Sequence, residues 1–184
     1  MNLSPGRIVK VDLTNLQKIE TLVLPGGDDY ITSAVIDSDE RYGYFGTATT
    51  PGKIIKIDLE TLTRVGELTL PRGEGNIETA ITNPAGTIAY FGSGSAPANI
   101  IEIDLTTFSR TRSLLLPANE SVLFSSVADA AGQYGYFGSH TSPAKIVKVD
   151  LSNLARVGSV SLTGYTQPMQ GAIEPAGVYL YYCL

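Results

Sequence analysis

The residues that most often carry covalent or redox chemistry are scarce in this sequence. It contains one cysteine, Cys183, one histidine, His140, and no tryptophan. A single cysteine excludes an intrachain disulfide, so the fold does not depend on one. No second histidine can join His140 in acid–base chemistry, and neither a Gly-x-Ser-x-Gly nucleophile elbow nor a phosphate-binding loop is present.

Long hydrophobic runs and basic clusters are also missing. No segment approaches the roughly 20 apolar residues of a membrane-spanning helix, and the amino terminus lacks the apolar stretch of a signal peptide. With 13 Lys and Arg against 18 Asp and Glu, the net charge is −5. This balance argues against nucleic acid and anionic membranes as partners. We therefore expect a soluble protein whose compartment is unknown, with no signal peptide or transmembrane segment in this chain.

What the sequence does contain is one unit repeated four times. The repeat is 46 residues long and is marked by three series: Asp12, Asp58, Asp104 and Asp150; Pro5, Pro51, Pro97 and Pro143; Leu24, Leu70, Leu116 and Leu162. This period, in copies rich in β-branched and aromatic residues, is typical of β-propeller blades rather than helical solenoids. With 43% hydrophobic residues and no Pro/Ser linker, residues 1–184 are predicted to form a single domain.

The second copy shows four strands separated by turn residues. The runs expected to form them are 31–36, 42–46, 53–59 and 64–70, and polar or Gly/Pro turns separate them. Ile54 and Ile55 are adjacent, which suits a strand that is covered on both faces. The predicted fold class is therefore all-β, a β-propeller of four-stranded antiparallel blades.

Three further series predict local features of each blade. The repeated aspartates are expected to accept backbone hydrogen bonds from two residues on and to fix turns. Gly46, Gly92 and Gly138 indicate bulges or close approach of neighbouring blades. The basic series at the start of the outermost strands is interpreted as a solvated face that discourages aggregation. Its members are Lys18, Arg64, Arg110 and Arg156.

Two strings carry a resemblance to a known family. They are Tyr44-Phe-Gly-Thr-Ala-Thr-Thr-Pro-Gly-Lys-Ile-Ile-Lys-Ile-Asp-Leu59 and Asn83-Pro-Ala-Gly-Thr-Ile-Ala-Tyr-Phe-Gly92. Both resemble repeats of the YVTN and lactonase-like β-propeller superfamily, and the resemblance covers essentially the whole chain. It is a blade motif and implies a fold rather than an activity. In that superfamily rings of seven or eight blades are common, and members include surface-layer proteins, lactonases and lyases.

The first and last blades are each split. The chain begins with two outer strands, 7–13 and 18–24, and finishes with two inner strands, 170–173 and 178–183, so the halves are complementary. The last copy is atypical: it has lost one residue, and Thr166 stands at the 46-residue step from Glu120. Open strand edges invite pairing.

Three ways of completing the propeller remain open. The half-blades can pair within one chain, giving a four-bladed monomer, or between two chains, giving an eight-bladed ring as a homodimer. The chain can also be part of a longer propeller. We favour the dimer, because the small residues Gly43, Ala89 and Gly135 suit the near-parallel packing of blades in a large ring.

Acidic loops provide the candidate ligand site. In a propeller, the loops from an outer strand into the next inner strand surround the channel mouth. Asp28, Glu74 and Glu120 are equivalent there, and the tentative ligand-binding set adds Asp29, Asn76, His140 and Tyr165. Like charges on one rim would attract a cation or a small polar ligand. Solvation of short polar loops is the competing explanation, and no metal or cofactor is predicted.

The favoured function is a non-enzymatic binding or assembly module that self-associates through its open half-blades. The alternative is a lactonase-like hydrolase or lyase acting on a small polar substrate at the channel mouth. His140 is the first residue to test for catalysis. No catalytic residue is assigned, because a polar cluster such as the resemblance would require cannot be matched in this sequence.

Overall fold

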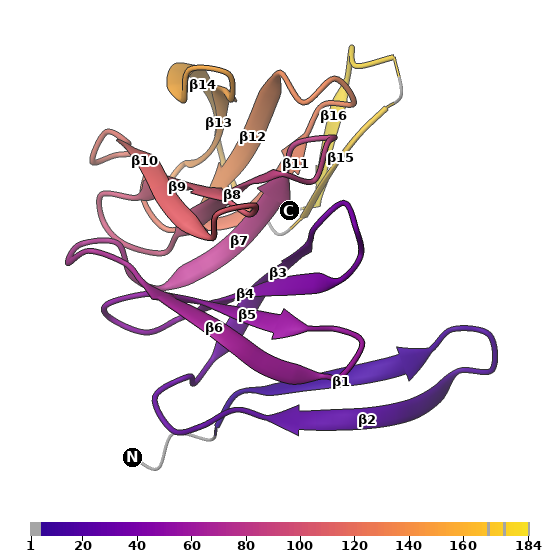
Figure 1. The fold of residues 1–184 in the computed structure, drawn as a ribbon. Coiled ribbons are helices and arrows are strands. Elements are labelled where there is room, and N and C mark those ends of the chain that lie inside the picture. The colour runs from indigo at the N-terminus through magenta and orange to yellow at the C-terminus, as the bar shows by residue number, and fades with distance from the viewer. Residues whose placement is uncertain (1–4, 169, 175, 184) are drawn as a thin grey trace.

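The computed structural model describes residues 5–168, 170–174 and 176–183. These residues form sixteen β-strands and no helix, so the described part contains no helix suited to crossing a membrane. The strands make three four-stranded and two two-stranded antiparallel sheets, which follow one another along an open arc (Figure 1). The predicted all-β class and four-stranded blades are confirmed.

Each whole sheet is built from four consecutive strands. The first blade comprises β3 (Ile31–Ile36), β4 (Tyr42–Thr47), β5 (Lys53–Asp58) and β6 (Thr63–Thr69). The second comprises β7 (Ile77–Thr82), β8 (Ile88–Ser93), β9 (Asn99–Asp104) and β10 (Ser109–Leu115). The third comprises β11 (Leu123–Ala128), β12 (Tyr134–Ser139), β13 (Ala144–Asp150) and β14 (Ala155–Leu162).

The two ends of the arc carry half-blades. β1 (Arg7–Asp12) pairs only with β2 (Gln17–Val23), and β15 (Gln170–Ile173) pairs only with β16 (Leu180–Cys183). Among the described residues the two half-blades do not pair with each other, and the arc is open in this structure.

The hydrophobic core lies between successive sheets rather than inside any one of them. Ile54 and Ile55 point to opposite faces of β5 and both are fully buried, as the adjacent apolar pair predicted. Three clusters repeat this arrangement, one at each joint from the amino-terminal half-blade to the third blade. Tyrosine hydroxyls also cross two joints: Tyr44 donates to the carbonyl of Leu105 at 2.9 Å, and Tyr90 to that of Leu151 at 3.1 Å.

The predicted turns and close approaches are both present. Asp104 Oδ1 accepts the backbone N–H of Thr106 at 2.8 Å, and the equivalent aspartates make the same bond. Hydroxyl and backbone N–H donors of the turn together lower the pKa of the aspartates, and for Asp104 the largest contribution is the N–H of Thr107. A Cβ on Gly46 would lie 2.5 Å from Ile77 of the next blade, so the second strands require glycine where the blades meet.

Candidate functional site

The three rim carboxylates occupy equivalent loops but are buried. The side chains of Asp28, Glu74 and Glu120 are 2%, 8% and 1% exposed. Each carboxylate residue closes a turn, because its N–H donates to the carbonyl of the proline three residues earlier. An ionised carboxylate is buried at high cost unless a cation or several hydrogen bonds compensate it.

An arginine on the outermost strand of the blade that the loop leads into provides that compensation. Arg110 Nε lies 2.8 Å from Glu74 Oε2, and its Nη2 lies 2.5 Å from Oε1. Arg156 binds Glu120 in the same way, at 2.7 and 2.6 Å. These bonds lower the pKa of Glu120 and raise that of Arg110. Paired N–H donors to one carboxylate are among the stronger charge-assisted contacts in proteins.

The first blade uses two cations for the same purpose. Arg64 Nε lies 2.7 Å from Asp28 Oδ2, and Lys53 Nζ lies 3.0 Å from Oδ1. The interpretation of the basic series as a merely solvated face was therefore wrong for its three arginines, because each holds a buried acid. Ligand binding by the three acids stays a prediction, and the geometry argues against it because their oxygens are already occupied.

The remaining predicted site residues do not converge on one point. Asp29 is buried, and its backbone forms an isolated antiparallel bridge with Pro5. Asn76 uses its backbone to bind Thr49 and Gly94. His140 is exposed, and its ring lies 5.5 Å from that of Phe124. No group of three or more His, Cys, Asp or Glu side chains in the described residues is placed to hold a metal ion.

Tyr165, rather than Thr166, takes the place of the acid in the last loop. Its N–H donates to Leu162 and its carbonyl accepts from Ala144, the two backbone bonds that Glu74 makes with Pro71 and Gly52. The residue that the last copy has lost therefore lies before Tyr165. The predicted alignment of Thr166 with Glu120 was wrong by one position. The Tyr165 side chain is 51% exposed.

The inner strands line a small polar cavity of about 280 Å³. Glu78 on β7 is the charged residue of its lining, and its neighbours there include Thr32, Phe124, Ser126 and Gln170. Burial raises the pKa of Glu78. Glu78 is not among the predicted site residues, and the repeat offers no signal for it because the equivalent positions carry Thr32 and Phe124.

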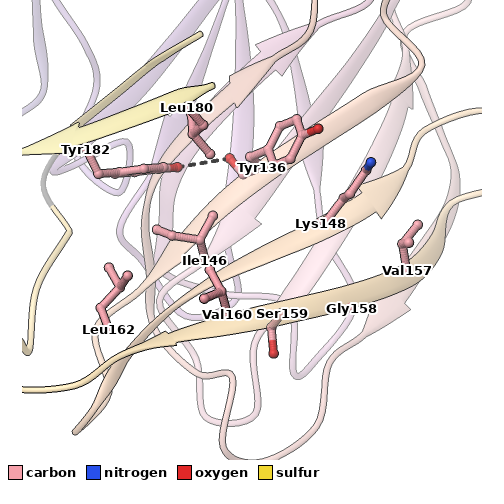
Figure 2. A pocket seen from close by; sticks show the side chains of 10 residues that line it. All are labelled: Tyr136, Ile146, Lys148, Val157, Gly158, Ser159, Val160, Leu162, Leu180 and Tyr182. Carbon is pink, nitrogen blue, oxygen red and sulfur yellow. Dashed lines mark hydrogen bonds between the residues drawn. The ribbon is translucent and has the colours of Figure 1, made fainter. Parts of the chain in front are cut away.

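The carboxy-terminal end of the arc holds a larger, apolar groove of about 520 Å³. It lies between the third blade and the last half-blade (Figure 2). Tyr136, Ile146, Val160 and Leu162 line one side, and Leu180 and Tyr182 line the other. One repeat earlier the equivalent residues Tyr90, Ile100, Leu114 and Leu116 pack against the third blade. The groove is therefore a joint between blades whose second side lacks its outer strands.

The amino-terminal half-blade exposes an apolar face. Val9, Val11, Leu13 and Leu16 are 50%, 46%, 80% and 76% exposed. Their equivalents in the third blade, Val147, Val149, Leu151 and Leu154, are 0%, 0%, 1% and 6% exposed. Apolar side chains this exposed on one strand and its turn mark an interaction surface. The repeat register could have identified them from the sequence, because each aligns with a buried core position.

Comparison with known proteins supports the propeller fold. No protein-family model and no curated protein matches the chain. Among solved structures, a chain of Kuenenia stuttgartiensis hydrazine synthase matches with a TM-score of 0.83 and 14% identity, over 95% of this chain and 48% of that chain. The β-propeller domain of Myceliophteria thermophila Cps50 (Swd1) matches with a TM-score of 0.71 and 17% identity, over 97% of this chain and 56% of that chain.

These likenesses show the fold alone. The chain spans about half the length of the chains it matches, so its blades follow the curvature of part of a larger propeller. Membership of the YVTN and lactonase-like superfamily stays a prediction.

Proposed function

We propose that this chain is a non-enzymatic assembly and binding module, and that two copies close a propeller by joining their half-blades. The single observation that carries the proposal is the match between the two ends. The apolar groove beside β16 lacks two outer strands, and β1 and β2 are two outer strands with an uncovered apolar face.

The repeat register defines how the halves would join. In the third blade, β12 pairs with β13 so that Gly138 is opposite Ile146. The same pairing between β16 and β1 of a second copy sets Cys183 opposite Ile8. It also inserts Val9 and Val11 into the groove, where Val147 and Val149 stand one joint earlier.

The curvature supports closure between chains rather than within one. The half-blades remain unpaired at opposite ends of the described arc (Figure 1). The four repeats match about half of each longer chain. A closed ring of the same curvature would therefore have room for a second arc of similar size. A second copy supplies it, giving eight blades, two of them composite, around a twofold axis.

Cys183 offers a direct test because it is the one cysteine in the chain and is exposed. Directly opposed residues of antiparallel strands have Cα atoms about 4.5–5.5 Å apart, within the range that a disulfide spans. We expect light scattering to give twice 19.5 kDa. We also expect Ile8→Cys to form a covalent dimer under mild oxidation.

A matched control is Val11→Cys, which moves the thiol three residues, or about 10 Å, along the strand. It should cross-link far more slowly. A disulfide within one monomer would overturn the proposal in favour of a four-bladed ring. A 19.5-kDa mass at all concentrations without cross-linking would overturn self-association altogether.

The binding part of the proposal concerns the cavity on the inner strands. A carboxylate among hydroxyl groups and an aromatic ring suits a small polar or cationic ligand, and Glu78 would be its anionic contact. Calorimetric titration with calcium and with tetramethylammonium should show weak binding that Glu78→Gln abolishes. Unchanged binding in that variant, or no heat from the parent, would overturn this assignment.

A further inference from the structure

The loop-to-strand ion pair follows a rule that breaks at both ends of the chain. At three blades, an acid in the loop leading into the blade binds an arginine 36 residues later, on the outermost strand. The acid has at most 8% of its side chain exposed in every case. The pair therefore fastens each incoming loop to the far side of the blade that it enters.

The carboxy-terminal loop departs from this rule because it carries Tyr165 where the acid belongs. Its backbone hydrogen bonds to Leu162 and Ala144 place it there. The outermost strand of the blade that this loop leads into is absent from the half-blade β15–β16.

The amino-terminal half-blade departs from it in the matching way. Lys18 is opposite Val11 in β1 and β2, as Arg156 is opposite Val149 in β13 and β14. Lys18 therefore occupies the arginine position, but the loop that would lead into its blade is not part of this half-blade. Acid and arginine are thus replaced together, at two sites 147 residues apart in the sequence (165 − 18).

We infer that Tyr165 of one copy faces Lys18 of the second copy across each composite blade, and that this pair distinguishes the chain-to-chain junction from the internal joints. The inference rests on the proposed assembly. A phenol ring and an ammonium group attract each other through a cation–π contact. Such a contact is weaker than a buried bidentate arginine–carboxylate pair.

The replacement also suits a surface that is exposed before assembly. Tyr165 is 51% exposed and Lys18 is exposed in the single chain. A tyrosine without charge does not recruit the arginine of an unrelated surface, so pairing depends on the matching strands and groove.

The test is to restore the internal chemistry at the junction. Tyr165→Glu combined with Lys18→Arg recreates the pair of Glu120 and Arg156. We expect this double variant to lower the Kd of the dimer at least tenfold, measured by analytical ultracentrifugation, and to make the affinity more sensitive to salt. Tyr165→Glu combined with Lys18→Glu should weaken the dimer at least tenfold through like charges.

The control is Tyr30→Glu, which makes the same change at an exposed tyrosine in the first loop. It should leave the Kd within about twofold of the parent value. If the parent dimerises and both double variants keep its Kd, the Tyr165–Lys18 contact is refuted while the assembly stands. A parent that never dimerises refutes the assembly and this inference together.

Discussion

Arg110 on β10 and Glu74 in the loop leading into the same blade are joined by two hydrogen bonds of 2.8 and 2.5 Å, although 36 residues separate them. The pair fastens the loop that enters the blade at β7 to β10, the outermost strand of the same blade. The Glu74 side chain is 8% exposed and the Arg110 side chain is 28% exposed.

Removing the cation should therefore destabilise the fold. Arg110→Ala leaves the Glu74 carboxylate buried without its partner, and we expect a loss of about 2–4 kcal/mol, below the fully buried limit because the arginine is partly solvated. Arg110→Lys should lose less, since it keeps the charge but not the two-pronged geometry. Urea unfolding at fixed protein concentration measures both. Arg72→Ala, at an exposed position of the same loop, should change stability by under about 0.5 kcal/mol.

The tyrosine hydroxyls separate folding from assembly. Tyr90→Phe removes the donor to the Leu151 carbonyl and should cost about 1 kcal/mol of unfolding free energy. Tyr136, one repeat later, faces the groove and would find its acceptor in Leu13 of a second copy. Tyr136→Phe should therefore leave the dilute monomer as stable as the parent but raise the dimer Kd about fivefold. Equal losses of monomer stability in both variants would contradict this division.

Glycine at the joints between blades should be irreplaceable. Gly46→Ala would place a Cβ 2.5 Å from Ile77 and against the Ser33 hydroxyl, so we expect a loss of about 1–3 kcal/mol. A Cβ on Gly26 meets nothing within 4 Å, and Gly26→Ala should be neutral within about 0.5 kcal/mol. Thermal unfolding of the two variants side by side checks the contrast.

Glu78 gives the fold a pH dependence of defined sign. Burial raises the pKa of Glu78, so the folded state binds this proton more tightly than the unfolded chain does. The resulting stabilisation is present below the unfolded pKa and is lost as pH rises through the folded pKa. At pH 7 Glu78→Gln should thus stabilise the protein, by less than about 1 kcal/mol because the group is partly solvated.

The gain should shrink as the pH is lowered to 4, where the parent carboxyl takes up its proton. Thermal unfolding at both pH values measures it, with Glu60→Gln on an exposed turn as the control. A gain at pH 4 as large as that at pH 7 would show that the benefit has another origin.

Features that depend on a short stretch of chain were predictable from the sequence. The turn at Asp104 and the need for Gly46 follow from backbone geometry that each copy repeats, so the register alone located them. The burial of both Ile54 and Ile55 followed from their adjacency in a strand. Blade number, strand order and the split ends came from the same repetition.

The ion pairs were not predictable in the same way. The series containing Glu74 and that containing Arg110 were each visible, but nothing local shows that residues 36 apart meet across a blade. A signal was nevertheless present in the incomplete blades. There the arginine series has Lys18, and the last loop has no acid at the equivalent position. The lost residue shifted that loop by one, so that Thr166 was aligned with Glu120 where the backbone bonds select Tyr165.

The order of the strands also governs when each part of the ring can form. Every whole sheet consists of four consecutive strands, so each can complete its hydrogen bonding as soon as it leaves the ribosome, in the order of synthesis. In the proposed assembly, the half sheets at the two ends would pair only after a second chain has been made. At low occupancy the amount of closed ring in that assembly would rise with the square of the subunit concentration, so expression level would set how much complete propeller forms.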